Sequence, residues 1–258
     1  EMSGTVEDPR EQGALLWVLA ILFAERDAQR AISSAREAHE RLYSNPISAL
    51  LVEQLATDGE DWATAGMFAR QAGSLTREST FGVDDLMRAG EIYRDRLREG
   101  GWAVQCFEQA MGIDPSDERA FTSLKDHFRQ EGDWDHVATL LEERILGTEE
   151  PQNRYALLRE LARVYENADR VDEAIAALRR ILSEEPEDPE SLSSLGALCV
   201  RTKNWEEAIS ALQERALLPM TSEQKVEIFQ TLGGLSVDQI PDPKKAIVCF
   251  EKVLAEGG

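Results

Sequence analysis

A pattern of apolar residues repeats at an interval of 34 residues between Tyr155 and Thr221. Five apolar or small residues of the first period have counterparts 34 positions later: Leu158, Leu161, Tyr165, Ala174 and Leu178 are matched by Leu192, Leu195, Cys199, Ala208 and Leu212. A fixed period of about 20–50 residues is the signature of a repeat architecture. Within each period the apolar residues fall at helical spacing in two blocks with a short polar break between them. Each period therefore predicts two amphipathic helices joined by a tight turn.

Small residues and prolines fall where two packed helices and their ends need them. Ala162 and Gly196 take the same place in the first helix of each period, and a small residue there lets two helix axes approach to about 8–10 Å. Pro186 is expected to end the second helix, because proline lacks a backbone N–H and clashes with the preceding turn. Asp188 is then expected to cap the next helix, with Pro189 at its first position.

The repeated unit resembles the tetratricopeptide repeat, whose pattern is roughly W-x2-L-G-x2-Y followed by Ala, Phe, Ala and Pro. Residues 189–221 supply Leu192, Leu195-Gly196, Cys199, Ala208 and Leu212. The resemblance implies an all-α fold, an α-solenoid of about seven antiparallel helix pairs forming a right-handed superhelix. It implies one solenoid domain over residues 1–258. The units are expected at about residues 12–45, 46–82, 83–117, 118–154, 155–188, 189–221 and 222–256.

The most apolar stretch is Ala14–Ala24, ALLWVLAILFA. Its 11 residues are fewer than the roughly 20 that a bilayer-spanning helix needs, so no membrane span is predicted. A helix that is apolar all round is buried on more than one side. The segment is therefore expected either to lie under a neighbouring repeat or to contact a second copy of the chain. The last helix carries Val253 and Leu254 with no polar capping helix after it, so we expect a longer array or a partner at that end.

Two further features of the sequence are a tryptophan that recurs at an equivalent position and a segment rich in Ser, Thr and Gly. Trp62, Trp102, Trp134 and Trp205 take equivalent places at the start of a second helix. An aromatic stripe is able to form a ligand platform, but the periodic placement favours a packing role in the core. A long loop is expected over Gly73–Asp84, which is rich in Ser, Thr and Gly.

The chain is strongly acidic, with 49 Asp and Glu against 28 Lys and Arg and a formal net charge of -21. This balance argues against a nucleic-acid partner, since phosphate binding needs clustered Lys and Arg. Two explanations of the acidic charge stay open. One is the solubility of an extended surface, and the other is a basic partner.

Cysteine usage favours a cytoplasmic location. Cys106, Cys199 and Cys249 lie on apolar helix faces without CxxC spacing, and they are expected to be buried free thiols. Free thiols fit a reducing compartment. Because the chain starts at Glu1, a periplasmic or anchored form whose upstream signal was removed stays open.

No catalytic, cofactor or metal site is expected. The sequence has no phosphate-binding loop, dinucleotide fingerprint, nucleophile elbow or HExxH motif. The histidines are His39, His127 and His136. The last two lie on different predicted helices of one unit, with no cysteine at ligand spacing, so they do not indicate a zinc site.

The resemblance also implies a concave face lined by the first helix of each pair, where members of the family bind protein segments. Mapping the family's ligand-facing positions places seven arginines and no lysine on the middle of this face: Arg88, Arg94, Arg119, Arg129, Arg159, Arg163 and Arg201. The planar guanidinium suits bidentate binding of a carboxylate. The hypothesis is that this groove docks an acidic or C-terminal carboxylate segment. The alternative is pairing within the chain, with Glu91, Asp126, Glu160 and Glu166.

Chaperone-binding members of the family resemble a two-carboxylate clamp built from Lys, Asn and Arg. The corresponding positions in this chain hold Thr122, Asp126, Ser123, Arg159 and Arg163, so a chaperone tail is not the expected ligand. We expect a non-enzymatic scaffold that binds a protein or peptide segment, with an acidic segment as the hypothesis. Two alternatives stay open: a homo-oligomeric module that self-associates through its terminal helices, and a regulatory arm of a larger protein.

Overall fold

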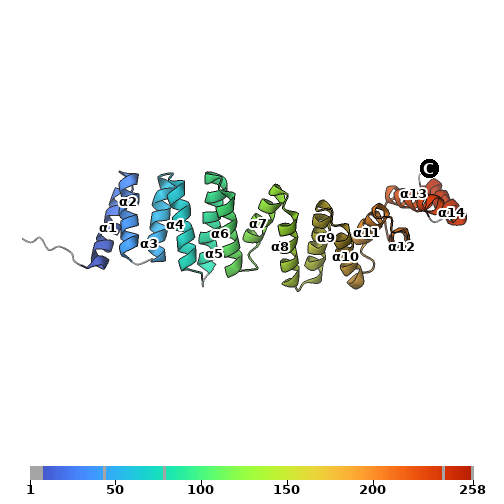
Figure 1. The fold of residues 1–258 in the computed structure, drawn as a ribbon, viewed down its shortest axis with the longest axis horizontal. Helices are drawn as coiled ribbons and strands as arrows, with labels where there is room; N and C mark the ends of the chain where they lie inside the picture. Colours follow the sequence, from blue (N-terminus) through green and yellow to red (C-terminus); the bar gives the residue numbers. More distant parts are fainter. Residues whose placement is uncertain (1–7, 43–44, 78–79, 240–241, 257–258) are drawn as a thin grey trace, which may run out of the picture. The chain divides into compact units, whose positions relative to one another are not determined.

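The computed structural model describes residues 8–42, 45–77, 80–239 and 242–256, and every regular element in these ranges is a helix. Within a unit, helices that follow one another in the chain pack side by side in antiparallel directions (Figure 1). They form two compact units, Glu1–Glu131 and Gly132–Gly258. Each unit is a stack of helix pairs that bury their apolar faces against neighbouring helices. The fold is an α-solenoid, as the 34-residue period predicts.

The first unit holds the helices up to α7. Their bounds are α1 (Pro9–Phe23), α2 (Ala28–Arg41), α3 (Pro46–Asp58), α4 (Trp62–Leu75), α5 (Thr80–Glu91), the π-helix η1 (Ile92–Leu97), α6 (Gly100–Ile113) and α7 (Glu118–Glu131). The second unit holds α8 (Trp134–Leu146), α9 (Pro151–Asn167), α10 (Val171–Glu184), α11 (Pro189–Arg201), α12 (Trp205–Leu217), α13 (Ser222–Asp238) and α14 (Pro243–Glu256). Each of the seven predicted repeats therefore contains one pair of α-helices. The pair predicted over residues 118–154 is divided, with α7 in the first unit and α8 in the second.

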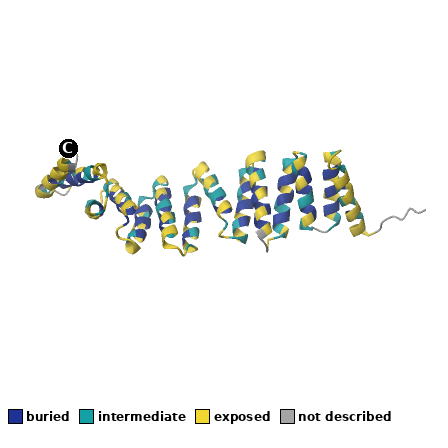
Figure 2. Ribbon diagram, turned by 180° about the vertical axis from the view of Figure 1, so that it is seen from behind, coloured by how far each residue is buried: buried dark blue, intermediate teal, exposed yellow. Residues whose placement is uncertain are grey.

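The helix ends lie where the proline and cap signals predict them. Helix α10 ends at Glu184, ahead of Pro186, and α11 begins at Pro189. The Asp188 side chain caps α11 by accepting a hydrogen bond from the backbone N–H of Ser191 at 2.8 Å. Figure 2 shows the result in each unit, with buried residues on the helix faces that meet and exposed residues on the remaining faces.

Helix α1 differs from the expectation for the apolar stretch. It buries Gly13 and Ala20, and it packs against α2. Its other face exposes large aliphatic side chains, including Leu15, Ile21 and Leu22, the last with 63% of its surface accessible. The prediction that a neighbouring repeat buries the helix on more than one side is therefore wrong. Contact with a second copy stays a prediction.

The predicted core role of the four tryptophans is also wrong. Trp62, Trp134 and Trp205 are half-buried, and Trp102 is exposed. A residue at the start of a helix lies beside the turn, at the edge of the interface between helices. Trp102 packs there through its ring faces, against Tyr93 with 6.1 Å between ring centroids and under the Arg70 guanidinium at 4.7 Å. The Trp102 ring therefore lies at the margin of the core rather than inside it.

The loop expected over Gly73–Asp84 is largely helical. Helix α4 continues to Leu75 and α5 begins at Thr80, while residues 78–79 lie outside the described residues. Serine and threonine remain in the last turn of α4 because their hydroxyls donate to helix carbonyls. Ser74 Oγ donates to the Arg70 carbonyl and Thr76 Oγ1 to the Ala72 carbonyl, both at 2.9 Å.

Candidate functional site

In the first unit, two of the predicted groove arginines connect the first helices of neighbouring pairs. Arg88 on α5 donates to Glu53 on α3, with Nε to Oε1 at 3.1 Å. Arg119 on α7 reaches back in the same way to Asp84 on α5, with Nη2 to Oδ1 at 2.8 Å. Arginine and carboxylate are 35 residues apart in both pairs, so each pair spans one repeat. These arginines therefore hold successive first helices side by side.

In the second unit, ion pairs likewise connect the first helices α9 and α11. Arg159 donates to Asp188 at 2.6 Å, Arg163 donates to Glu190 at 2.6 Å, and Arg201 lies 3.6 Å from Glu166. The Arg159–Asp188 pair is mostly buried, whereas the Arg163 and Arg201 side chains are more than half exposed. The buried pair is thus the part of this network that contributes most to the fold.

Arg94 and Arg129 complete the predicted set of seven. Arg94 donates to its neighbour Asp95 at 2.8 Å and lies over the Phe107 ring, while Arg129 also interacts with surrounding groups. Of the four carboxylates expected as partners, Glu166 pairs with Arg201, and Glu160 also has an interaction partner. The hydrogen bond from Arg94 to Asp95, with the charges of Glu91 and Asp126, raises the pKa of Arg94. Most other pairs use carboxylates one repeat away, which the sequence analysis had not named. The structure thus brings the arginines into ion pairs along the first helices instead of into one cluster.

A cavity of about 350 Å³ opens on the first helices of the first unit. It lies among α3, α5, η1 and the start of α4, and Arg88 and Arg96 line it together with Glu53, Glu91 and Asp95. The cavity is therefore lined by charges of both signs, and Arg88 is already held by Glu53 and Asp85. Nothing in this arrangement favours a ligand of one charge.

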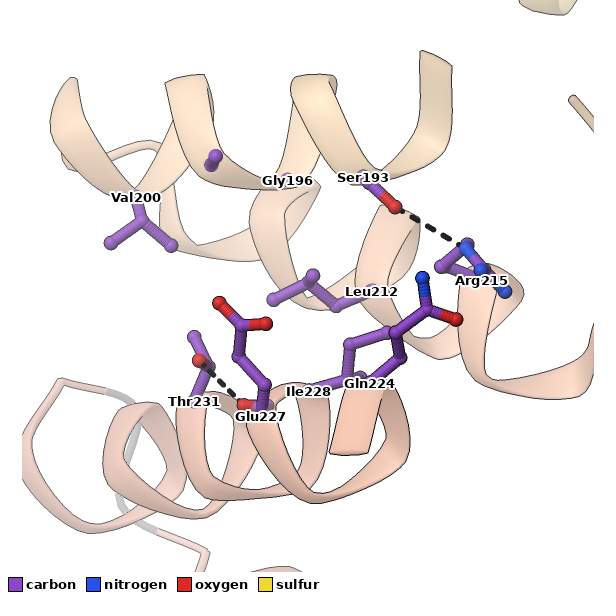
Figure 3. Close-up of a pocket in the computed structure, with 10 residues that line it drawn as sticks. Ser193, Gly196, Val200, Leu212, Arg215, Gln224, Glu227, Ile228 and Thr231 are labelled. Carbon is purple, nitrogen blue, oxygen red and sulfur yellow. Dashed lines mark hydrogen bonds between the residues drawn. The ribbon is translucent and has the colours of Figure 1, made fainter. Parts of the chain in front are cut away.

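A second cavity, of about 470 Å³, lies between the first helices α11 and α13 of the second unit, with α12 behind it. Its lining is drawn in Figure 3: Ser193, Gly196, Ala197, Val200, Leu212, Arg215, Gln224, Glu227, Ile228 and Thr231. Val200 and Glu227 point into the space between the two helices (Figure 3). An apolar floor with a few polar groups at its margin, at this volume, is typical of a ligand pocket.

Glycine at position 196 sets the depth of this cavity. A Cβ atom there would lie 2.8 Å from Cδ2 of Leu212, so only glycine allows α11 and α12 to approach this closely. Ala197, the next residue, is exposed and adds one methyl group to the wall. Small residues on α11 thus leave the space that a partner's side chain would need.

Arg215 is the one fully charged group in the cavity wall that the fold buries, with 6% of its surface accessible. Its Nε donates to Ser193 Oγ at 3.2 Å and its Nη1 donates to the Pro219 carbonyl oxygen at 3.3 Å. Both acceptors are neutral, and among the described residues no carboxylate lies within 4.0 Å of its guanidinium. A buried guanidinium without an anionic partner is energetically costly. The wall therefore holds a buried cation that contacts no carboxylate, whereas Glu227, the carboxylate among the lining residues, is exposed on α13.

Arg215 is not among the residues predicted from the sequence, because the family's ligand-facing positions lie on the first helix of each pair and Arg215 lies on the second helix α12. A signal was present, since Ala208, Leu212 and Arg215 follow one another at spacings of four and three on the buried stripe of α12. A cation at a position where the helical period predicts an apolar residue marks either an internal ion pair or a binding group.

The described ranges contain neither a metal-binding cluster nor a membrane-spanning helix. No group of three His, Cys, Asp or Glu residues is placed to hold a metal ion. No helix in these ranges combines the length and the apolar character that crossing a bilayer requires.

The sequence profile of the tetratricopeptide repeat matches residues 159–223, which run from α9 to the start of α13. The chain contains a tetratricopeptide repeat segment. These residues include α11 and α12 and six residues that line the cavity: Ser193, Gly196, Ala197, Val200, Leu212 and Arg215. None of the curated protein sequences matches the chain.

Solved structures with similar folds are tetratricopeptide-type helical arrays at low sequence identity. The C-terminal part of a TPR repeat-containing protein from Cytophaga hutchinsonii is 14% identical, with a TM-score of 0.49, 93% of this chain covered and 94% of that one. A chain of the Naa15/Naa10 structure bound to HypK-THB is 13% identical, with a TM-score of 0.53 and 95% of this chain covered. The alignment spans 38% of that second chain. At these identities the likeness concerns the fold alone.

Proposed function

We propose that the chain is a non-catalytic scaffold that binds a carboxylate-bearing segment of another protein in the cavity between α11 and α13. Tetratricopeptide repeats generally mediate protein–protein interaction, which supports the class of function. The single observation that carries the binding site is the buried Arg215, whose guanidinium contacts no carboxylate of the described residues, in the wall of this cavity. A carboxylate from a partner would supply the anion that the fold itself does not provide.

The energetic reason lies in the surroundings of Arg215. The Arg215 guanidinium is buried, so it is already shielded from water, and its hydrogen bonds to Ser193 and Pro219 fix its orientation. Binding of a ligand carboxylate therefore costs little additional side-chain entropy. A charge-assisted hydrogen bond in such a place contributes roughly 1.5–3 kcal/mol. Apolar contact with Val200 and Ile228 adds the burial of the partner's side chain.

The arginines on the first helices have a secondary role in this proposal. Arg201 follows Val200 at the cavity rim, and its ion pair with Glu166 is long and exposed. An acidic partner segment is able to exchange with Glu166 there at small cost, because an exposed pair contributes only about 0–1 kcal/mol. Arg163 is similarly exposed on α9. We assign these two exposed arginines to flanking contacts and the buried Arg159 to the fold.

The proposal is tested by filling the cavity. Ala197→Phe places a ring in the space between α11 and α13 from an exposed position, so the core stays unchanged. Ser210→Phe is the matched control, because it adds the same exposed ring on α12 at a residue that does not line the cavity. Random peptides displayed on phage are selected on the wild-type chain, and the selected peptides are titrated against all three proteins. Circular dichroism confirms equal helical content beforehand.

We expect selected peptides to carry Asp, Glu or a free C-terminal carboxylate beside an apolar residue. Ala197→Phe should abolish their binding and Ser210→Phe should preserve it. Peptides that bind Ala197→Phe as well as the wild type, or that are enriched in lysine and arginine, would contradict the proposed site.

A second candidate function, self-association, is favoured by the exposed aliphatic face of α1. Leu15 and Leu22 lie seven residues apart on this face, with two helical turns between them. If two copies bury these faces together, the mass measured by light scattering should rise with concentration and return to the 28.9 kDa of one chain in Leu15→Glu/Leu22→Glu. A concentration-independent mass of one chain in the wild type would exclude this candidate.

A further inference from the structure

A third cavity, of about 530 Å³, lies at a different face of the second unit, among α12, α13 and α14. Its floor is apolar, with Leu217, Phe229, Leu232 and Val248. Helix α13 separates it from the cavity that contains Arg215, since Ile228 and Thr231 line that one whereas Phe229 and Leu232 line this one. The two cavities therefore present two separate surfaces.

Positive charge surrounds this third cavity. The chain has six lysines, and three of them, Lys244, Lys245 and Lys252, line it. Among the described residues that line it there is no Asp or Glu, although the chain has 49 of them. Lys245 is paired with Asp242, whose carboxylate lies 3.7 Å from the exposed Lys245 ammonium. In a chain of net charge -21 this is a local reversal of sign.

The lysines are placed to meet a ligand that lies on the apolar floor. Lys252 is held with its ammonium 4.6 Å from the centre of the Phe229 ring, so its charge stays at the edge of the floor. Lys244, Val248 and Lys252 follow one another at intervals of four residues, so they lie along one side of α14. Two positive charges thus flank an apolar centre over a length of about 12 Å.

We propose that this surface docks an acidic amphipathic helix of another protein, with its aliphatic side chains on Phe229 and Val248 and its carboxylates on Lys244 and Lys252. An amphipathic helix presents apolar residues every three to four positions with charged residues beside them, which is the pattern that this surface complements. The charge pattern selects an acidic helix over a basic or neutral one, because like charges at an interface oppose binding.

The experiment uses a designed peptide as its probe. A fluorescein-labelled helix of about 18 residues, with Leu at helical spacing and Glu on both sides of the Leu stripe, is titrated into the full chain and followed by anisotropy. A second peptide carries Lys at each Glu position. The acidic peptide should bind, its affinity should fall with added salt, and the basic peptide should bind at least about tenfold more weakly.

Matched variants separate this surface from the general charge of the chain. Lys244→Glu/Lys252→Glu should weaken the acidic peptide about tenfold, since two attractions become repulsions. Lys125→Glu/Lys203→Glu makes the same change in net charge at residues that do not line the cavity, and it should change the affinity less than about twofold. The neutral Lys244→Gln/Lys252→Gln gives an intermediate loss and keeps the test valid if the doubly reversed variant loses helical content.

Cys249 lines the same cavity and reports where the peptide binds. It is partly exposed, whereas Cys106 and Cys199 are buried, so N-ethylmaleimide should modify it first in the folded protein. The bound acidic peptide should slow its alkylation several-fold, as measured by mass spectrometry of the modified site. Equal affinity for both peptides, equal losses in the two double-charge variants, or an unprotected Cys249 would each overturn the proposal. Protection that instead arises from a concentration-dependent dimer without peptide would assign the surface to a second copy and overturn it too.

Discussion

Gly90→Ala tests how closely the two helices of one pair must approach. Gly90 lies on α5 against Phe107 of α6, and a Cβ atom at residue 90 would lie 2.8 Å from both Cδ1 and Cζ of the Phe107 ring. This is closer than the about 3.5–4.0 Å at which carbon atoms attract one another. The ring is 1% exposed, so it has no room to swing aside. The two helices must therefore separate or the ring must leave its preferred rotamer.

The expected magnitude combines two opposing effects. Overpacking a core costs about 1–3 kcal/mol, while Gly→Ala in a helix contributes about 1 kcal/mol in favour of folding. Because Phe107 cannot relax, we expect the upper part of the first range and a net loss of about 1–2 kcal/mol of unfolding free energy. Urea unfolding followed by circular dichroism measures it, with an unchanged m-value as the check that both proteins unfold in the same way.

Gly112→Ala is the matched control, because Gly112 is exposed on α6 and a Cβ there meets no atom within 4 Å. It should stabilise the chain by about 0.5–1 kcal/mol through helix propensity alone. If Gly90→Ala is as stable as Gly112→Ala, then the close contact with Phe107 does not determine the spacing of the pair, and this account of the packing is wrong.

Three further predictions concern the second unit and the cysteines. Arg159→Leu should cost about 2–3 kcal/mol of unfolding free energy, since it leaves the mostly buried Asp188 carboxylate without its cation; urea titration checks this, and a loss under about 0.5 kcal/mol would contradict it. Burial raises the pKa of Asp188, but hydrogen bonds from Arg159 and the Ser191 backbone outweigh it, and the pKa is lowered overall. Asp188 therefore contributes stability that is present above its unfolded-state pKa and is lost as the pH falls through its lower folded-state pKa, so acid unfolding of Arg159→Leu should depend less on pH in that range. Burial raises the pKa of the Cys106 thiol to about 11 and that of Cys199 to about 12, so maleimide at neutral pH should leave both unmodified until the chain unfolds; fast labelling in the folded state would refute their burial.

The sequence predicts the helix pairs well because their signals are local. The helical spacing of apolar residues within each period, Pro186 and the cap at Asp188 each act within a few residues of where they stand, and the structure confirms the element that each one predicts. The burial of the tryptophans was predicted wrongly, because a periodic pattern shows that residues take equivalent positions but does not show how deeply those positions are buried. Depth depends on neighbouring helices, and a residue beside a turn lies at the edge of their interface.

The binding cavity depends on tertiary spacing that no local pattern encodes. Its volume arises where α11 and α13 face one another across α12, and it combines the absence of a side chain at Gly196 with a cation at Arg215 on a second helix. The arginines on the first helices were identifiable from sequence, but their partners were not. Carboxylates about one repeat away, such as Glu53 for Arg88, become neighbours only when the repeats stack.

The most direct test of the proposed function is a crystal structure of the chain with a peptide selected from the phage library. We expect the peptide to lie between α11 and α13, with a carboxylate oxygen about 2.7–2.9 Å from a terminal nitrogen of Arg215. We also expect an apolar peptide side chain against Val200 and Ile228. A peptide bound elsewhere on the chain, or one in this cavity whose carboxylates all face solvent while Arg215 keeps only Ser193 and Pro219, would contradict the proposal.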